Sequence, residues 1–255
     1  MTSPRGTLWL VPTPLDFKQP PQPPLAQVLP GATLAQAAKL THWIGESAKS
    51  TRAFLQRVAA EQPLAAPLQA MTIAELPRAA HKHGDHQPNA ALDEAARALL
   101  APALQGHDMG LASEAGLPAV ADPGASVVRA AHALGVAVQP LPGASSITLA
   151  LAASGLNGQH FAFVGYLPTG TARAAQLRTL EQTALRLGQT QVCIETPYRN
   201  AALLADLLQH LQPSTRLALA ANLGQQPQVR LASVAQWRRH AWAAPETPCV
   251  FMWGP

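Results

Sequence analysis

The chain has 255 residues, of which 48% are apolar, 13% charged and 5% aromatic. This composition excludes a disordered chain, because disordered segments are poor in apolar residues and rich in charge. At roughly 100 to 150 residues per domain, the length fits one large domain or two modest ones. The 18 Lys and Arg outnumber the 14 Asp and Glu, a net charge of +4, and 14 of the 18 cations are Arg. Arg suits phosphate groups, but genomic base composition also explains an Arg-rich, Lys-poor chain and is the favoured explanation.

The first half of the chain predicts an α/β domain. Short apolar runs alternate with amphipathic stretches of helical period. Asp122-Pro123-Gly124 is typical of a helix start, so we expect Asp122 to be the N-cap. A strand, loop, helix and strand within about thirty residues form a βαβ unit, which implies a parallel sheet. The expected strands are 7–11, 41–45, 68–73, 109–112 and 136–141, and the expected helices are 33–39, 48–60, 90–100 and 123–134.

Two segments of this half are expected to be irregular. Residues 17–31 are rich in Pro, and we predict a long, mobile loop between Ala74 and Asn89. This loop contains His81-Lys82-His83-Gly84-Asp85-His86, which lacks both a Cys partner and the i, i+4 spacing of a zinc site. No metal site is therefore predicted. A solvated loop is the favoured interpretation, and a lid that faces the substrate is the alternative.

The second half repeats the α/β pattern. Its expected strands are 161–164, 190–194, 216–221 and 249–253, and its expected helices are 171–187, 198–211 and 234–242. Between the halves, Pro142-Gly143-Ala144-Ser145-Ser146 opens a short helix of small residues. We therefore predict an N-terminal α/β domain over 1–142, a hinge helix over 143–157 and a C-terminal α/β domain over 158–255.

The two cysteines and the apolar runs bear on the compartment. Cys193 and Cys249 lie far apart within apolar runs, which favours buried, reduced thiols over a disulfide or a zinc site. The apolar run at Leu8–Val11 is far too short for a signal peptide. No run approaches the roughly 20 apolar residues that span a bilayer. We expect a cytoplasmic protein.

The strongest local motif is the loop Ser113–Gly124, with the sequence SEAGLPAVADPG. It follows a predicted parallel strand, and open α/β sheets bind ligands beyond the carboxyl ends of their strands. Gly116 permits close approach of a ligand to the backbone, and Pro118 and Pro123 stiffen the loop. Taken alone, the loop could also merely turn the chain and cap a helix. The motifs of dinucleotide-binding folds, P-loop ATPases and α/β-hydrolases are absent from the sequence.

Four segments, in this order and spacing, resemble the tetrapyrrole methylase superfamily. They are Thr13-Pro14 after the first strand, the Ser113–Gly124 loop, LPGASSITLALAASGL at 141–156 and FAFVGYLP at 161–168. Within the superfamily, the chain is most similar to the branch of ribosomal RNA small subunit methyltransferase I, which methylates a cytidine ribose 2′-hydroxyl. The resemblance covers nearly the whole chain. It implies two α/β domains with S-adenosylmethionine in a cleft between them, and usually a homodimer.

The resemblance also implies site residues. The segments that would contact the cofactor are Pro12, Thr13 and Pro14; Glu114, Ala115, Gly116, Val120 and Ala121; Ser145, Ser146 and Ile147; Glu195, Thr196, Pro197 and Tyr198; Ala221, Asn222 and Leu223; and Thr247 and Pro248. Asn222 could instead be a turn residue, and Tyr198 a packing residue at a helix start. For the proton and charge of the acceptor hydroxyl, the catalytic candidates are His83, Glu46 and Arg199.

The sequence departs from this branch in three places. Leu15-Asp16-Phe17 stands where the ribosomal enzyme has Gly-Asn-Leu, and an acidic Glu-Asp-Thr-Arg stretch is reduced to Glu46-Ser47. A charged Arg-Glu-Leu-Thr-Lys segment appears as the uncharged residues 221–225. Three functions therefore stay open: methylation of a ribose hydroxyl of 16S ribosomal RNA, methylation of a small molecule such as a tetrapyrrole, and cofactor binding without catalysis. If RNA is the substrate, the arginines of the second half either line its path or solvate helices; these are Arg173, Arg178, Arg186 and Arg199.

Overall fold

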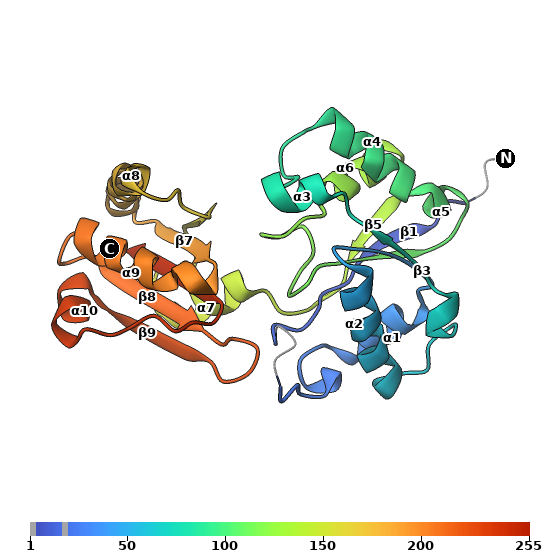
Figure 1. The fold of residues 1–255 in the computed structure, drawn as a ribbon, viewed down its shortest axis with the longest axis horizontal. Coiled ribbons are helices and arrows are strands. Elements are labelled where there is room, and N and C mark those ends of the chain that lie inside the picture. Colours follow the sequence, from blue (N-terminus) through green and yellow to red (C-terminus); the bar gives the residue numbers. More distant parts are fainter. Residues whose placement is uncertain (1–3, 17–19) are drawn as a thin grey trace. The chain divides into compact units, whose positions relative to one another are not determined.

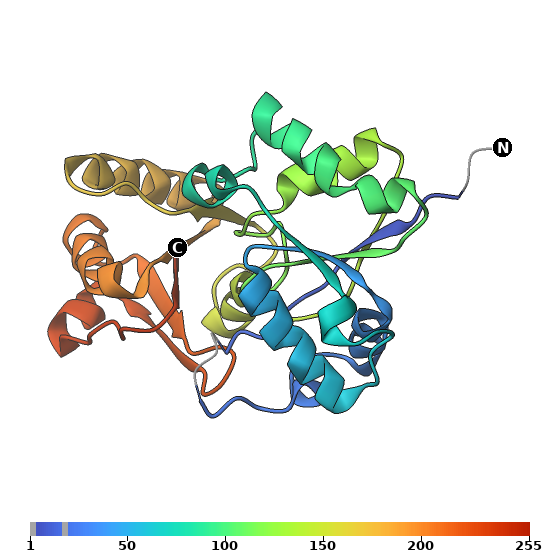
Figure 2. The same cartoon turned by 45° about the vertical axis from the view of Figure 1, so that its right-hand side comes forward.

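The computed structural model describes residues 4–16 and 20–255, with the backbone alone at 81–83. The chain forms two compact units, residues 1–145 and 146–255. Each unit is a five-stranded sheet covered by helices (Figures 1 and 2). The predicted α/β class is therefore confirmed. In the part of the chain that is described, no helix combines the length and the apolar character needed to cross a bilayer.

The first unit is built on a parallel sheet with the strand order β3-β2-β4-β1-β5. Each pairing in this sheet is parallel, as the βαβ pattern predicted. Adjacent residues of one strand point to opposite faces: Trp43 packs into the core on one side of the sheet and Ile44 into the core on the other. The strands are β1 (Thr7–Leu10), β2 (His42–Gly45), β3 (Thr72–Glu75), β4 (Met109–Ala112) and β5 (Ala137–Pro140).

Helices cover both faces of this sheet. The helices are α1 (Gly31–Lys39), α2 (Ala48–Glu61), α3 (Arg78–His83), α4 (Ala90–Leu99), α5 (Ala101–Leu104) and α6 (Ala125–Ala133), with 3-10 turns η1 (Leu25–Gln27) and η2 (Leu68–Ala70). The helices α1 and α2 share a core with Trp43, whereas α4 and α6 share the core of Ile44. Figure 1 shows the two pairs on opposite sides of the strands.

Three local predictions for the first unit are wrong. Residues 68–70 form a 3-10 turn after Pro67, and the strand begins only at Thr72. The segment expected to be a mobile loop contains the helix α3. The helix α6 begins at Ala125, and its N-cap is Gly124 rather than Asp122.

The second unit is a mixed sheet with the strand order β6-β7-β10-β8-β9. Only β6 and β7 pair in parallel, and β10 inserts antiparallel between β7 and β8. The sequence analysis missed β9, an edge strand with three polar and three apolar residues, none of which is fully buried. The strands are β6 (Phe161–Gly165), β7 (Thr190–Glu195), β8 (Arg216–Ala221), β9 (Gln228–Ser233) and β10 (Cys249–Gly254).

The helices of the second unit are α7 (Ser146–Ser154), α8 (Thr171–Leu187), α9 (Asn200–His210) and α10 (Val234–His240), with the 3-10 turn η3 (Pro197–Arg199). The helices α8, α9 and α10 pack on one face of the sheet, and α7 packs on the other. The predicted hinge helix thus contains α7, which contributes Ile147, Ala150 and Leu151 to the core of the second unit. Cys193 and Cys249 are free and buried, as expected, and burial raises the pKa of both thiols.

Candidate functional site

The loops after β1 and β4 lie where the sheet of the first unit changes direction. From β1 the chain continues to β2 by way of α1, and from β4 it continues to β5 by way of α6, so that the two connections cover opposite faces. Since β1 and β4 are neighbours in the sheet, their loops diverge at a topological switch point. This position is where open α/β sheets bind ligands.

A short backbone bridge joins these two loops. The Thr13 amide donates to the Gly116 carbonyl at 2.9 Å, and the Gly116 amide donates to the Thr13 carbonyl at 3.0 Å. The Thr13 hydroxyl donates to the Ser113 carbonyl at 3.2 Å. Two segments that the sequence analysis assigned to cofactor binding, about a hundred residues apart, are thereby brought together.

The backbone of the Ser113–Gly124 loop is strained at several positions. The φ angles are +86° at Gly116 and +132° at Gly124, and they are also positive at two alanines, +64° at Ala119 and +62° at Ala121. A left-handed conformation costs an L-residue with a Cβ about 1 kcal/mol or more. Strain of this kind concentrates at ligand clamps and active sites. The conformation of the loop therefore supports a functional role rather than a simple turn.

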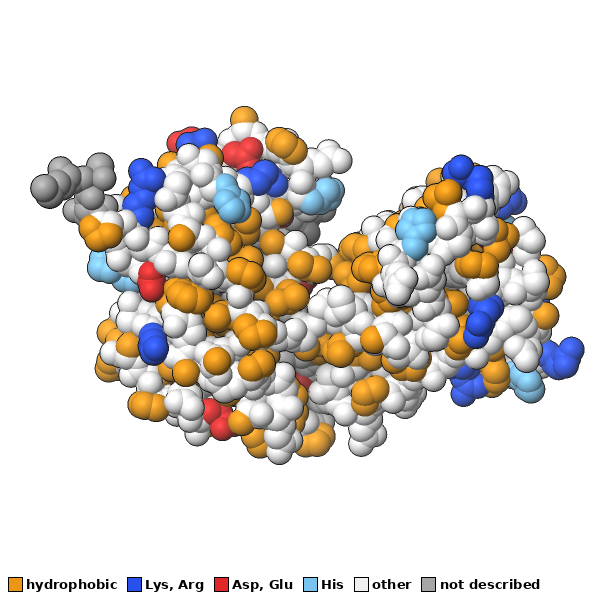
Figure 3. All heavy atoms as spheres, turned by 180° about the vertical axis from the view of Figure 1, so that it is seen from behind, with side chains coloured by type: hydrophobic (Ala, Val, Ile, Leu, Met, Phe, Trp, Pro, Cys, Tyr) orange, Lys and Arg blue, Asp and Glu red, His pale blue; other side chains and the backbone are white. Residues whose placement is uncertain are grey.

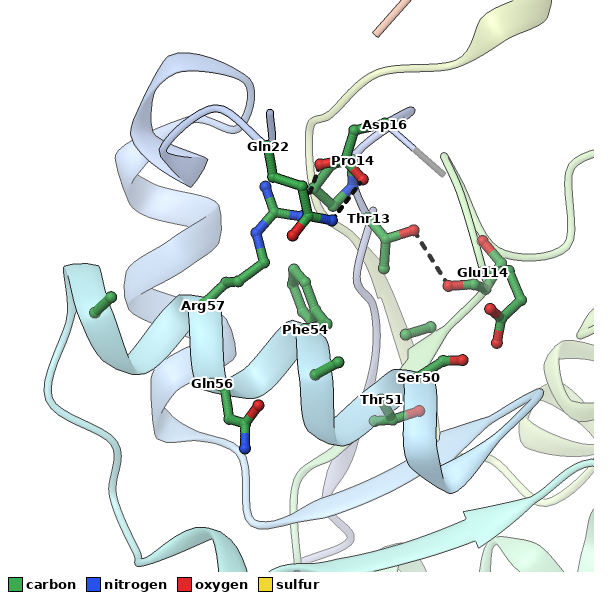
Figure 4. A pocket seen from close by; sticks show the side chains of 14 residues that line it. Thr13, Pro14, Asp16, Gln22, Ser50, Thr51, Phe54, Gln56, Arg57 and Glu114 are labelled. Carbon is green, nitrogen blue, oxygen red and sulfur yellow. Dashed lines mark hydrogen bonds and ion pairs between the residues drawn. The ribbon is translucent and has the colours of Figure 1, made fainter. Parts of the chain in front are cut away.

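A pocket of about 370 Å³ opens beside this loop (Figure 4). Three of the predicted cofactor residues line it, Thr13, Pro14 and Glu114. On the opposite wall, α2 contributes Phe54, whose ring points toward the loop that carries Thr13 and Pro14, and Arg57. The volume lies in the range of small-molecule sites.

The sequence analysis missed the ion pair in this pocket. Arg57 Nη1 lies 2.7 Å from Asp16 Oδ2, and the Asp16 side chain is only 3% exposed. A second Arg57 nitrogen donates to the Pro23 carbonyl at 2.9 Å. The pair therefore fastens the Pro-rich segment to α2. Asp16 follows the Thr-Pro motif directly, which was a usable signal, but nothing in the sequence linked it to a residue 41 positions away.

Three carboxyl groups meet near the carboxyl ends of β2 and β4. The Glu114 amide donates to Glu46 Oε1 at 2.9 Å, which brings Glu46 to the loop. Burial, and then the charges of Glu46 and Glu114, raise the pKa of Asp122 to about 7, although a hydrogen bond from Ser113 opposes the rise. Asp122 therefore holds a proton up to neutral pH and can act as a hydrogen-bond donor.

The His-containing segment is tied to the same loop through Asp85. Asp85 Oδ2 accepts hydrogen bonds from the Gly124 amide at 3.0 Å, the Ser126 amide at 2.9 Å and the Ser126 hydroxyl at 2.6 Å. Burial alone would raise the pKa of Asp85, but the bonds from Ser126 and Gly124 outweigh it, and the pKa is lowered. Asp85 is 2% exposed, so the prediction of a solvated loop is wrong at this residue.

The other polar groups of this segment bear on the metal and base predictions. No group of three or more potential metal-binding side chains occurs among the residues whose side chains are described. His83 ends α3, and its side chain lies outside the described part of the structure. Its assignment as a catalytic residue stays a prediction.

In the second unit, the predicted cofactor segments gather at one edge of the sheet. Cys249 pairs with Glu195 of β7 on one side and with Ala221 of β8 on the other. Because β10 is antiparallel to both strands, its beginning, with Thr247 and Pro248 before it, lies where β7 and β8 end. Asn222 follows with a φ of +54° and begins the turn to β9. These segments therefore lie at the same edge of the sheet, and their contact with the cofactor stays a prediction.

Glu195 is already engaged by arginines. Its side chain is fully buried; Arg199 Nη2 lies 2.8 Å from Oε1, and Arg173 lies 3.6 Å from Oε2. Arg173 is buried as well and pairs with Asp206 at 2.8 Å. Tyr198 is 79% exposed, so it is not a packing residue. Arg173 therefore lies inside an ion-pair network, and an RNA path along it is excluded.

Buried polar atoms without a hydrogen-bond partner also occur at this edge. Among the described residues these include Thr247 Oγ1, Asn200 Oδ1 and Glu195 Oε2. The Asn200 amide group donates to the Pro245 and Thr247 carbonyls at 2.9 and 2.8 Å, which orients its oxygen. Buried polar groups are normally satisfied, so this edge is suited to a polar ligand.

Comparison with known proteins agrees with this description. A family model described as Tetrapyrrole (Corrin/Porphyrin) Methylases matches residues 43–236. The Ribosomal RNA small subunit methyltransferase I of Pseudomonas aeruginosa is 31% identical over 95% of this chain and 74% of its own length. Those of Xylella fastidiosa and Micromonospora olivasterospora are 32% and 33% identical over 79% of this chain, which corresponds to 63% and 55% of their lengths.

Solved structures share the fold. A uroporphyrin-III-C-methyltransferase from Thermus thermophilus has a TM-score of 0.51 and 21% identity, over 98% of this chain and 92% of that chain. The methyltransferase CobJ has a TM-score of 0.55 and 15% identity, over 97% and 93%.

The fold, the two bridged loops and the matches to known proteins together define the chain as an enzyme of the methyltransferase class. Enzymes of this class in general use S-adenosylmethionine. The chain belongs to the tetrapyrrole methylase family. The resemblance stated from sequence motifs is confirmed.

Proposed function

We propose that the chain transfers a methyl group from S-adenosylmethionine to a ribose 2′-hydroxyl of 16S ribosomal RNA. Relatives at 31–33% identity carry the name of the ribosomal RNA enzyme. The tetrapyrrole enzymes are at most 21% identical and support the fold alone. RNA is therefore favoured over a small-molecule acceptor. The observation that carries the proposal is the backbone bridge between Thr13 and Gly116, which joins the two family loops at the switch point.

The residues present fit the cofactor. S-adenosylmethionine joins an adenosine to a charged methionine, so its site must offer hydrogen-bonding groups over an extended path. In the first unit, the bridged loops after β1 and β4 supply backbone groups next to the pocket. In the second unit, Thr247 Oγ1 and Asn200 Oδ1 are buried atoms without a partner among the described residues. We therefore keep the predicted residues of each unit as proposed cofactor contacts, Ser145, Ser146 and Ile147 among them.

The catalytic task of the chain is alignment and proton removal. When bound, the cofactor supplies an electrophilic methyl group. The protein must then hold the acceptor oxygen in line with it and exclude water. Glu46 is our first choice of base, because the Glu114 amide fixes its carboxylate beside the loop at 2.9 Å. Asp122 keeps a proton next to it, which limits the negative charge of the cluster. Arg199 acts through Glu195 as a positioning residue, and His83 is the second choice of base.

Titration calorimetry with S-adenosylmethionine tests cofactor binding. We expect saturable heat from the wild-type chain and a loss of affinity of about tenfold for Thr247→Val, which removes a buried hydroxyl that the ligand would satisfy. Thr179→Val, at an exposed position of α8, is the control. Absence of heat from the wild type at millimolar cofactor would contradict the methyltransferase proposal.

Mass spectrometry of ribosomal RNA tests the acceptor. Small subunits from a strain that lacks this chain should miss a ribose methylation that the purified wild-type protein restores with added cofactor. Glu46→Gln should restore it at least about a hundredfold more slowly, with cofactor affinity unchanged. An identical methylation pattern in the two strains would favour a small-molecule acceptor or a binding protein without catalysis.

The proposed substrate also bears on assembly and location. Ribosomal RNA is methylated in the cytoplasm, so we propose a cytoplasmic protein, and the family resemblance supports a homodimer. Light scattering during size-exclusion chromatography should give twice the 26.8 kDa mass of the chain. A monomer at micromolar concentration would contradict the dimer.

A further inference from the structure

The net positive charge of the chain belongs entirely to its second unit. Residues 1–145 contain ten Lys and Arg and ten Asp and Glu, whereas residues 146–255 contain eight Arg, no Lys and four acidic residues. The first unit is therefore neutral, and the second carries the whole charge of +4. Composition alone could not indicate this division, because it averages over the two units.

The acidic residues of the second unit contribute little to its surface. Glu181 and Glu195 are 3% and 5% exposed, and Asp206 is paired with Arg173. Glu246 is the remaining acidic residue, and it is exposed. The exposed charge of this unit thus comes mainly from arginines, and Figure 3 shows Arg side chains spread over one face of it.

Two basic side chains stack on one tryptophan, and the short helix α10 beside them carries two further arginines. The group, here called the α10 patch, consists of Arg230 on β9, Arg238, Arg239 and His240 on α10, and Trp242. Arg238 donates to the carbonyls of Leu208 at 2.7 Å and Leu211 at 3.1 Å, at the end of α9. Arg239 and His240 are exposed, and Arg239 has no hydrogen-bond or ion-pair partner among the described residues.

Stacking holds this patch in place. The guanidinium of Arg230 lies 3.8 Å from the centre of the Trp242 ring, and the His240 ring stacks on Trp242 at 4.8 Å with an angle of 11° between the planes. Trp237 meets Trp242 edge-on at 5.0 Å and is itself anchored by a hydrogen bond to the Leu217 carbonyl. The side chains of Arg230 and His240 are therefore preorganised, which lowers the entropy lost when they bind a ligand.

We propose that the α10 patch binds the phosphate backbone of the RNA substrate. This inference rests on the proposed function, in which the acceptor is RNA. Guanidinium groups bind phosphate oxygens through two parallel hydrogen bonds. Stacked Arg and His side chains also present flat faces to unpaired bases. An acidic protein would be complementary in charge but would not require the stacked surface.

Fluorescence anisotropy with a labelled hairpin of small-subunit ribosomal RNA tests the patch in the full-length chain. Arg230→Gln combined with Arg239→Gln should weaken binding at least about tenfold at 0.1 M salt, and the slope of log K against log salt should fall by about 2. The matched control is Arg178→Gln with Arg186→Gln, two exposed arginines of α8, which removes the same charge from the same unit. Its effect should stay below about threefold.

Further measurements separate the outcomes. Arg239→Gln alone, which breaks no contact among the described residues, should reduce the salt slope by about 1 and keeps the test valid if the double variant misfolds. Cofactor binding by calorimetry should be unchanged in all variants. If both double variants weakened RNA binding equally, or if the wild type bound no RNA, the proposal that the α10 patch binds RNA would be wrong. Absence of cofactor heat together with patch-dependent RNA binding would overturn the methyltransferase proposal and leave the patch standing.

Discussion

Ala119 and Ala121 show how the ligand loop is held in its conformation. Both have left-handed φ angles, +64° and +62°, which are rare for a residue with a Cβ. The Ala119 amide donates to the Pro123 carbonyl at 3.3 Å, so the loop closes on itself. Hydrogen bonds across the loop, rather than residue preference, therefore impose these angles.

We predict that Ala121→Gly stabilises the first unit by about 1 kcal/mol, because Gly adopts a positive φ without the Cβ penalty. Urea unfolding followed by circular dichroism measures the change. Ala59→Gly, at an exposed position of α2, should instead destabilise the unit by about 1 kcal/mol. A loss of stability in Ala121→Gly equal to that of the control would show that Ala121 is not strained.

Asp122 makes the stability of the first unit depend on pH. Its pKa of about 7 in the folded chain lies above the ordinary value of 3.8, so folding favours the protonated form. Its contribution is complete below pH 4 and is lost as the pH rises through 7. Asp122→Asn cannot ionise, and its stability relative to wild type should therefore rise between pH 4 and pH 8. Urea unfolding at several pH values tests this, and a constant difference across that range would refute the buried protonated carboxyl.

At the scale of elements, α6 depends on Asp85, a residue 39 positions before its N-cap, Gly124. The Asp85 carboxylate accepts hydrogen bonds from the Gly124 and Ser126 amides, as the side chain of an N-cap residue does in other helices. Asp85→Ala should destabilise the first unit by about 2 kcal/mol, because these buried donors lose their acceptor. Asp85→Asn keeps an acceptor oxygen and should cost about half as much. The measurement is urea unfolding at pH 7, and equal losses in the two variants would contradict the capping role.

The same element marks the limit of prediction from sequence. The spacing of apolar residues along the sequence located most strands and helices, because it indicates which face of each element is buried. It could not locate β9, because none of the residues of this edge strand is fully buried. The cap of α6, the pair of Asp16 with Arg57 and the burial of Arg173 were also missed. Each of these features depends on contacts between residues that are far apart in the sequence and meet only in the folded chain.

The predicted site residues divide in the same way. Sequence motifs located the loops of Thr13 and Gly116, because the residues that shape such a loop are neighbours in the sequence. The ion pairs of Glu195 with Arg173 and Arg199 could not be inferred, since nothing in the sequence shows which side chains face a strand-end carboxylate.

At the scale of the whole molecule, the uneven charge predicts where RNA contacts the chain. Because residues 1–145 are neutral and residues 146–255 carry +4, phosphate contacts should concentrate in the second unit. Modification of arginines with phenylglyoxal, read by mass spectrometry, should be suppressed by RNA at Arg230 and Arg239. Arg97 on α4 should be modified equally with and without RNA. Protection confined to the first unit would contradict this distribution.

The position of β10 has a consequence for biosynthesis. It is the central strand of its sheet, between β7 and β8, yet it follows all the other strands of that sheet in the sequence. During translation, β8 and β9 can form a hairpin early, but β7 and β8 each lack a neighbouring strand until β10 has been made. In the first unit the last strand to be made is β5, which lies at the sheet edge, and this unit can fold while the second is still being synthesised. The growing chain thus completes the unit with no net charge before the unit that carries the net charge of +4.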